Sequence, residues 1–226
     1  MTYEEVLETV LMYMARERDT RLTKVFPKSL QVVEAKVNAM LRTMNMSSRV
    51  EYQVTEEELE EAEDTKSVFL VPPDFQGLRE ITVLDENRQS PVTLFPASNK
   101  QQNRFIQGFT EFNAQEDTKY VGMYTLVANK IRVQPPLTLG EILRITYYRQ
   151  IPPLCEGKEA NWLSSLYPDI YIKGVLSEFN KIVRDFEAAN AYQVEFQSHL
   201  EGIKMIDRTD KASGTPGIAS VDFYVP

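Results

Sequence analysis

Hydrophobic and polar positions repeat along the chain with a period that changes twice. Residues 3–44 repeat every three or four positions, as a helix buried along one face does, and residues 67–150 alternate as strands do. The helical period returns after about residue 162. The pattern predicts an α+β fold: a helical bundle built from both ends of the chain, with an inserted antiparallel β module and an extended C-terminal arm.

The N-terminal region is predicted to be a helical hairpin. Thr2 can cap the first helix while Glu5, three residues later, reaches back to the cap amide. The second helix is expected to begin at Phe26-Pro27, because proline suits the first turn of a helix. The apolar stripe of the first helix is Val6, Leu7, Val10, Leu11 and Met14, and that of the second is Leu30, Val33, Val37, Met40, Leu41 and Met44.

Residues 51–64 are dominated by carboxylates and are expected to form a short solvated helix or loop, with Thr55 and Glu58 spaced as a second capping box. A divalent-ion site is disfavoured, because the segment lacks the alternating oxygen ligands and central glycine of a calcium loop. The acidic residues are Glu56, Glu57, Glu58, Glu60, Glu61, Glu63 and Asp64.

The β module is predicted from short alternating runs that end at turn residues. Pro72 and Pro73 end the first strand, and Asn129 is expected to adopt the turn conformation of a hairpin within residues 125–133. The Gln- and Asn-rich residues 98–119 are expected to be a long exposed loop. The expected strands are 67–71, 78–84, 92–95, 123–127, 130–134 and 142–149.

Two further helices are predicted at the C-terminal end. Tyr167-Pro168-Asp169 places a proline and an acid at the start of the first. The last runs from about Asp185 to about Ala212 and carries a seam with a heptad-like spacing. Gly174 and Gly202 stand alone inside these helices and indicate close packing. The seam residues are Ala189, Tyr192, Phe196, His199, Ile203 and Ile206.

The end of the sequence is apolar beyond a pair of helix breakers. A tail this apolar is expected to dock on a partner surface, and the alternative is that it folds back on its own bundle. Its apolar residues are Ile218, Val221, Phe223, Tyr224 and Val225. The predicted segments are therefore a helical hairpin at 1–50, an acidic connector at 51–66, a β-rich module at 67–155, a helical return at 156–212 and an arm at 213–226.

Composition narrows the class of protein. The chain has 226 residues, 42% of them hydrophobic and 26% charged, as a folded domain of this size has. The net charge of −8 argues against nucleic-acid binding as its main role. No apolar run approaches the roughly 20 residues of a membrane span, and the acidic first residues do not resemble a secretory signal. The protein is expected to stay in a cytoplasm, unless it leaves in a larger particle.

Candidate catalytic chemistry is sparse. His199 is the single histidine, and its position on the seam favours a packing or interface role. Cys155 is the single cysteine, so it has no partner for a disulfide or a thiolate metal site. Asp169 and Asp185 are explained as residues of helix starts. We therefore predict no catalytic, cofactor-binding or metal-binding residues, and a metal-dependent hydrolase built on the acidic cluster is disfavoured.

Five segments, read in order, resemble the head-to-tail adaptor (neck connector) proteins of tailed bacteriophages from about residue 3 to about residue 212. The most specific has Asn161-Trp162-Leu163 four residues before Tyr167-Pro168-Asp169. Asn161 is expected to cap a turn there, and Trp162, Tyr167 and Tyr171 to anchor the chain as it returns from the β module. The five segments are 25–42, 69–81, 131–136, 143–154 and 161–176.

The resemblance implies a structural role with no enzymatic activity or cofactor. It implies a dodecameric ring under the portal protein, which extends the DNA channel and provides a platform for tail attachment. In such a ring the acidic residues of 56–64 are either solvated or face the channel, where they would repel phosphate. The implied partners are the portal, neighbouring copies and tail or nozzle proteins, with double-stranded DNA passing through unbound and no membrane. The implied location is the virion neck, assembled in the bacterial cytoplasm. The alternatives are another neck or tail completion protein and a non-viral acidic interaction module.

Overall fold

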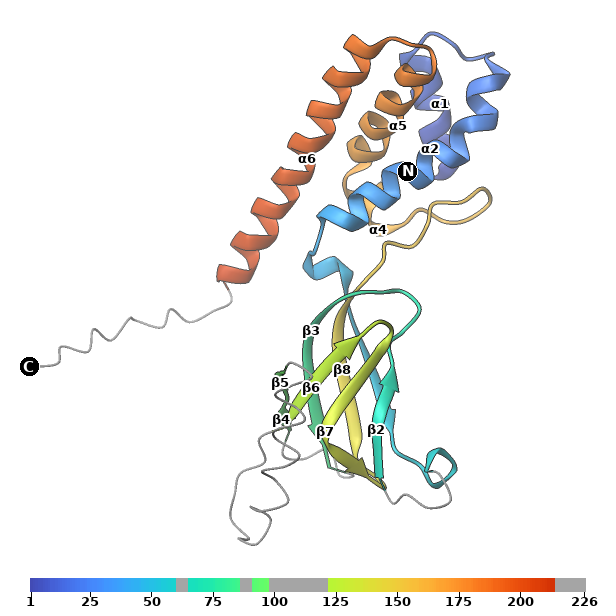
Figure 1. The fold of residues 1–226 in the computed structure, drawn as a ribbon. Coiled ribbons are helices and arrows are strands. Elements are labelled where there is room, and N and C mark those ends of the chain that lie inside the picture. Colours follow the sequence, from blue (N-terminus) through green and yellow to red (C-terminus); the bar gives the residue numbers. More distant parts are fainter. Residues whose placement is uncertain (60–64, 86–90, 98–121, 214–226) are drawn as a thin grey trace, which may run out of the picture. The chain divides into compact units, whose positions relative to one another are not determined.

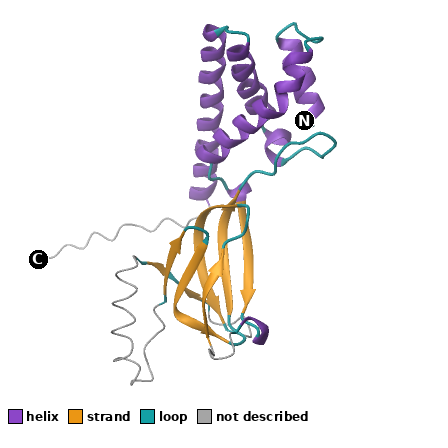
Figure 2. Ribbon diagram, turned by 45° about the vertical axis from the view of Figure 1, so that its right-hand side comes forward, coloured by secondary structure: helices purple, strands orange, loops and turns teal. Residues whose placement is uncertain are grey.

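The computed structural model describes residues 1–59, 65–85, 91–97 and 122–213 (Figure 1). The chain divides into two compact units, of which the first joins Met1–Met46 to Ile151–Pro226 and the second is Ser47–Gln150. Figure 2 shows the described strands confined to the second unit. The predicted α+β fold, with helices from both ends of the chain packed together and a β module inserted between them, is confirmed.

The helical unit is organised around one central helix. Helix α5 packs against each of the other α-helices of the unit. Rings from three helices form an edge-on row, in which Tyr3 lies 4.7 Å from Phe26 and Phe26 lies 6.2 Å from Phe179. The helices are α1 (Tyr3–Tyr13), α2 (Thr20–Met40), η1 (Met44–Met46), α4 (Trp162–Leu166), α5 (Pro168–Ile182) and α6 (Phe186–Ser213).

The start of α1 is as predicted, and the start of α2 is not. Thr2 accepts a hydrogen bond from the Glu5 amide, and the Glu5 side chain bonds back to the Thr2 amide. Helix α2 begins at Thr20, because Asp19 caps it by accepting a hydrogen bond from the Arg21 N–H at 3.0 Å. The expected start at Phe26-Pro27 is therefore wrong. Pro27 lies inside α2.

The apolar stripe of α2 is confirmed in its centre and fails at its end. Leu30, Val33, Val37 and Leu41 are buried, but Met40 is half-buried and Met44 is exposed, because the helix stops at Met40.

Both predicted C-terminal helices are present. Pro168 occupies the first turn of α5 with Asp169 beside it, and the Asp185 carboxylate caps α6 by accepting a hydrogen bond from the Ala188 N–H. The predicted α6 seam is only partly correct, because His199 is exposed and Ile206 is half exposed at 50%. Leu200 takes the place predicted for His199. The buried seam is Ala189, Phe196, Leu200 and Ile203.

One of the two lone helix glycines is needed for close packing. A Cβ atom on Gly174 of α5 would lie 2.7 and 2.9 Å from the Val33 methyl groups and 3.2 Å from the Phe196 ring. Glycine therefore lets α5 approach α2 and α6 at once, as predicted. The same prediction is wrong for Gly202, because a Cβ atom there would meet nothing within 4 Å.

The β unit consists of two sheets. Their strand orders are β1-β8-β3-β4 and β2-β7-β6-β5, and buried side chains from both sheets form one core. The expected antiparallel arrangement holds for these pairs apart from the short β5–β6 pair, which is parallel. The strands are β1 (Ser47–Gln53), β2 (Thr65–Leu70), β3 (Phe75–Leu84), β4 (Val92–Thr93), β5 (Phe95–Pro96), β6 (Met123–Val127), β7 (Lys130–Thr138) and β8 (Ile142–Arg149).

Strand β1 was not predicted. It includes residues 51–53, which were expected to be a solvated helix or loop. Tyr52 packs against the core, and Glu51 forms an ion pair of 2.8 Å with Arg144 of β8. The acidic character of the segment therefore does not oppose a strand, because its charge is matched across the sheet. The short helix η2 (Glu56–Glu58) follows, but Thr55 makes no side-chain cap, so the second capping box is wrong.

Strand β7 continues past its expected end at Gln134 and includes Pro135 and Pro136. Its pairing with β6 ends at Gln134, and its pairing with β2 skips from Arg132 to Leu137. Pro135 and Pro136 therefore lie where no ladder hydrogen bond is needed. In the β6–β7 hairpin, Ala128 and not Asn129 has the positive φ angle, at 53°.

Candidate interaction surface

The residues predicted to form sites are only partly within the described structure. Glu56 and Glu57 are exposed on η2, and Glu58 lies in the same turn. Glu60, Glu61, Glu63 and Asp64 lie outside the described residues, as do Ile218, Val221, Phe223, Tyr224 and Val225 and the predicted loop at 98–119. Across the ranges that the structure describes, no group of three His, Cys, Asp or Glu side chains is placed to hold a metal ion.

The two residues considered for catalysis are far apart in the sequence and differ in solvent exposure. Cys155 is half-buried as a free thiol and His199 points to solvent. None of the helices described is both long and apolar enough to cross a membrane.

A buried carboxylate fixes the chain where it re-enters the helical unit. Glu34 of α2 accepts hydrogen bonds from the Leu154 N–H at 2.7 Å and from the Tyr171 hydroxyl at 3.3 Å. Burial raises the pKa of Glu34, and the two hydrogen bonds oppose this shift. Asn161 completes the network by donating to the Pro152 carbonyl at 2.7 Å and to the Tyr171 hydroxyl at 2.8 Å.

The expected roles of the return-segment residues are resolved in part. The Asn161 side chain caps α4 by accepting a hydrogen bond from the Ser164 N–H at 2.8 Å, as predicted. Tyr171 is fully buried, as an anchor should be. Trp162 and Tyr167 are half-buried, and the Trp162 indole N–H is buried with no partner among the described residues.

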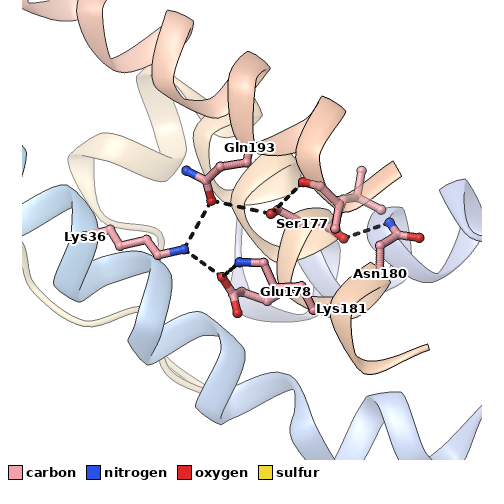
Figure 3. A network of polar contacts seen from close by, with 8 residues as sticks. Lys36, Ser177, Glu178, Asn180, Lys181 and Gln193 are labelled. Carbon is pink, nitrogen blue, oxygen red and sulfur yellow. Dashed lines mark hydrogen bonds and ion pairs between the residues drawn. The ribbon is translucent and has the colours of Figure 1, made fainter. Parts of the chain in front are cut away.

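A second polar network joins three helices (Figure 3). Lys36 of α2 donates to Glu178 of α5 at 2.7 Å and to Gln193 of α6 at 3.2 Å. Burial raises the pKa of Glu178, but hydrogen bonds from Lys181 and Lys36 outweigh it and hold that pKa below its ordinary value. Ser177 donates to the Ala189 carbonyl at 3.0 Å. These contacts fix α6 against α5 and α2.

An open pocket lies where α1 ends and α5 turns into α6. We call it the end pocket; its volume is about 590 Å³, and Tyr13, Arg16, Arg184, Phe186 and Tyr192 are among its lining residues. Tyr13 and Phe186 are 60% and 63% exposed, which is unusual for aromatic side chains of a single folded unit. The pocket therefore combines aromatic walls with charged groups.

Two helix ends of the same kind shape the end pocket. After α5, the Asp185 N–H bonds to the Asn180 carbonyl and the Arg184 N–H to the Lys181 carbonyl, with Arg184 at a φ of 65°. This is a Schellman motif, in which glycine is the usual residue at the left-handed position. The same motif closes α1, where Ala15 has a φ of 52°.

A lysine supports the aromatic wall from within. The Lys173 ammonium lies 6.0 Å from the Tyr13 ring and 5.3 Å from the Tyr192 ring, and forms an ion pair of 2.6 Å with Glu195. The hydrogen bond to Glu195 raises the pKa of Lys173 above its ordinary value. The lysine therefore stays charged and holds both rings by cation–π attraction.

Sequence reasoning did not find the end pocket. Its residues come from two segments far apart in the chain, 13–16 and 180–192, and no local pattern connects them. The one signal was that Tyr13 and Phe186 lie off the apolar stripes of their helices.

The comparison with protein families covers both units. The model of the SU10 adaptor protein family matches residues 1–220. The chain belongs to the SU10 adaptor protein family. This is a family of structural phage head-to-tail adaptors that is not known to be catalytic, so the resemblance found in the sequence is confirmed. Comparison with curated protein sequences finds no match.

Membership of this family gives the setting of the protein. It is a structural component of a phage and acts as a head-to-tail adaptor. An adaptor binds other proteins of the virion. The surfaces of the SU10 adaptor described above are therefore candidates for those contacts.

Proposed function

We propose that this SU10 adaptor forms a dodecameric ring that docks under the portal protein in the virion neck. The ring extends the DNA channel and provides the platform on which tail or nozzle proteins attach. It is assembled in the cytoplasm of the bacterial host. The observation that carries the proposal is the family match over residues 1–220, which spans both compact units.

The exposed apolar side chains support an assembly of many copies. Tyr13, Ile182 and Phe186 are exposed around one end of the helical unit. Removing these apolar side chains from water in an interface would be favourable. A ring needs two different surfaces on each copy, one for each neighbour. The helical unit offers one of these surfaces at its end pocket.

The charge of the chain suits a channel through which DNA passes without being held. The net charge is −8, and Glu56 and Glu57 are exposed. A wall of this charge repels phosphate, so DNA slides without specific contacts.

The apolar residues 218–225 dock on a partner surface, either the portal or a neighbouring copy.

Co-sedimentation with purified portal tests the proposal. The adaptor should sediment with the portal and saturate it as its concentration rises, and removal of residues 214–226 should weaken this binding. An adaptor that stays in the supernatant at every concentration would instead favour another neck or tail completion protein. Binding that is unchanged by the truncation would show that the C-terminal arm is not needed for docking on the portal.

A further inference from the structure

The end pocket has a size and a lining that call for a specific occupant. We infer that it receives the apolar C-terminal residues 218–225 of a second copy of this chain. The inference rests on the proposed ring and names the contact between its neighbours. Three observations support it: the chemistry of the pocket, the chemistry of the segment, and the distance between the two along one chain.

The pocket is large enough for the side chains of a short peptide. Its volume of about 590 Å³ lies within the roughly 300–1,000 Å³ of typical ligand sites. Phe186 is 63% exposed and Tyr13 is 60% exposed, so both rings gain by being covered. Lys173 contacts the rings of Tyr13 and Tyr192 and so preorganises the aromatic wall for binding.

The charges of the pocket leave one arginine available. Arg16 pairs with Asp19 at 3.6 Å, and Asp185 is occupied as the cap of α6. Arg184 makes no ion pair within the described part of the chain, and Glu187, which also lines the pocket, carries the opposite charge. A suitable partner is therefore mainly apolar, with an acid to meet Arg184.

Residues 214–226 have this composition. They contain Asp222 as their one charged side chain and no lysine, arginine or glutamate. In an extended chain, Val221, Phe223 and Val225 would share one face, and Asp222 would lie on the other. Pro216 and Gly217 disfavour a helix that would lead into these apolar residues. Phe223 is suited to the aromatic wall, and Asp222 is suited to Arg184.

The length of α6 argues that the segment comes from another copy. Phe186, the first residue of α6, lines the pocket, and Ser213 is the last residue of the helix. These ends are about 40 Å apart, at about 1.5 Å per residue. Phe223 follows Ser213 by ten residues, which span at most about 36 Å. Phe223 of the same copy would reach the nearest lining residue of α6, Tyr192 at about 32 Å from Ser213, only if the chain ran almost fully extended back along its own helix, so a second copy is the better source of the segment.

A contact of this kind joins different surfaces on the two copies. The end pocket of one copy takes the arm of the next, whose own pocket takes a third arm. Such a head-to-tail interface closes into a ring when the rotation between copies allows it. The inference therefore gives the proposed ring a defined lateral contact.

Pairwise cysteine cross-linking in the full-length chain tests the contact. In a background with Cys155→Ser, one chain carries Tyr13→Cys and the other carries Phe223→Cys. Oxidation of the mixture, in concentrated solution and on the portal, should give a disulfide-linked dimer of the two chains. Val194→Cys in place of Tyr13→Cys is the matched control, because Val194 is equally exposed at 65% but does not line the pocket, and it should give no dimer.

Two results would overturn the inference. One is the absence of the Tyr13–Phe223 dimer both in solution and on the portal. The other is a link formed within a single chain when both cysteines are placed on it. Portal recruitment of the same variants is measured separately. Recruitment without the dimer would contradict the arm contact but not the adaptor ring. If even the wild-type chain is not recruited, the ring proposal itself is contradicted.

A binding assay provides a second readout. A fluorescent peptide of residues 214–226 should bind the full-length chain, and Phe186→Glu should weaken that binding by about tenfold or more, as loss of a central aromatic contact does. Val194→Glu should leave it unchanged. Equal binding by the two variants would contradict the inference.

Discussion

The Glu34 carboxylate lies 2.7 Å from the backbone N–H of Leu154, although the two residues are 120 positions apart. This hydrogen bond ties the segment leaving β8 to α2, in the interior of the helical unit. Among the described residues no cation pairs with this carboxylate, and burial disfavours its charge. The pair makes the stability of the helical unit sensitive to pH.

Glu34→Gln should flatten the pH dependence of stability. Burial raises the pKa of Glu34 in the folded state above the ordinary 4.5. The stability that its protonated form contributes is therefore fully present below that value and is lost as the pH rises through the raised folded pKa. Glutamine keeps the acceptor and the shape without the charge. Chemical denaturation at pH 4 and pH 8 should show a smaller loss of stability for the variant than for the wild type.

Glu34→Ala is the control for the hydrogen bonds themselves. It leaves the Leu154 N–H and the Tyr171 hydroxyl without their acceptor, so it should cost about 1–3 kcal/mol at both pH values. An equal pH dependence in wild type and Glu34→Gln would show that Glu34 is not the group responsible.

Gly174→Ala should destabilise the protein, and Gly202→Ala should not. The new methyl group at position 174 would collide with Val33 and crowd Phe196, and overpacking of this kind costs about 1–3 kcal/mol. At position 202 the methyl group meets open space and improves helix propensity by about 0.5–1 kcal/mol. Thermal unfolding of the two variants gives opposite shifts. Val33→Ala should partly restore the Gly174→Ala variant by making room, and a lack of restoration would place the collision elsewhere.

Glycine at the two left-handed helix ends should stabilise the fold. Ala15 and Arg184 adopt positive φ angles of 52° and 65°, which cost a side-chain-bearing residue about 1–2 kcal/mol. Ala15→Gly and Arg184→Gly remove that cost, and the greater freedom of glycine in the unfolded chain offsets part of the gain. We expect each to raise the free energy of unfolding by about 0.5–1 kcal/mol. A loss of stability in both variants would contradict the Schellman geometry at these ends.

Pro27→Ala should also be stabilising. Pro27 is exposed inside α2 and cannot donate a hydrogen bond to the carbonyl four residues earlier, on Thr23. Alanine supplies the missing N–H and has the best helix propensity, so a gain of about 1–3 kcal/mol is expected. Urea denaturation measures it. A decrease would mean that the bend imposed by proline is needed for packing in the helical unit.

Local signals in the sequence were enough for much of the fold. The Thr2–Glu5 capping box and Pro168 at the start of α5 were predicted, because caps depend on residues within one turn. Strands β6 and β8 were predicted with the bounds that they have, since their alternation is regular.

The features that sequence reasoning missed depend on partners far along the chain. Strand β1 was hidden because Glu51 is neutralised by Arg144, 93 residues away. The seam of α6 passes through Leu200 and not His199, because α5 and not an ideal heptad decides which face is buried. The end pocket joins Tyr13 to Phe186, which no local pattern connects.

The mass of the portal complex tests the central claim most directly. Purified portal, the adaptor alone and their mixture are measured by mass photometry. The account predicts that the mixture gains the mass of one closed adaptor ring, a dodecamer of the 26.0 kDa chain, with no stable partial occupancy at saturation. A portal of unchanged mass beside a monomeric adaptor would contradict it.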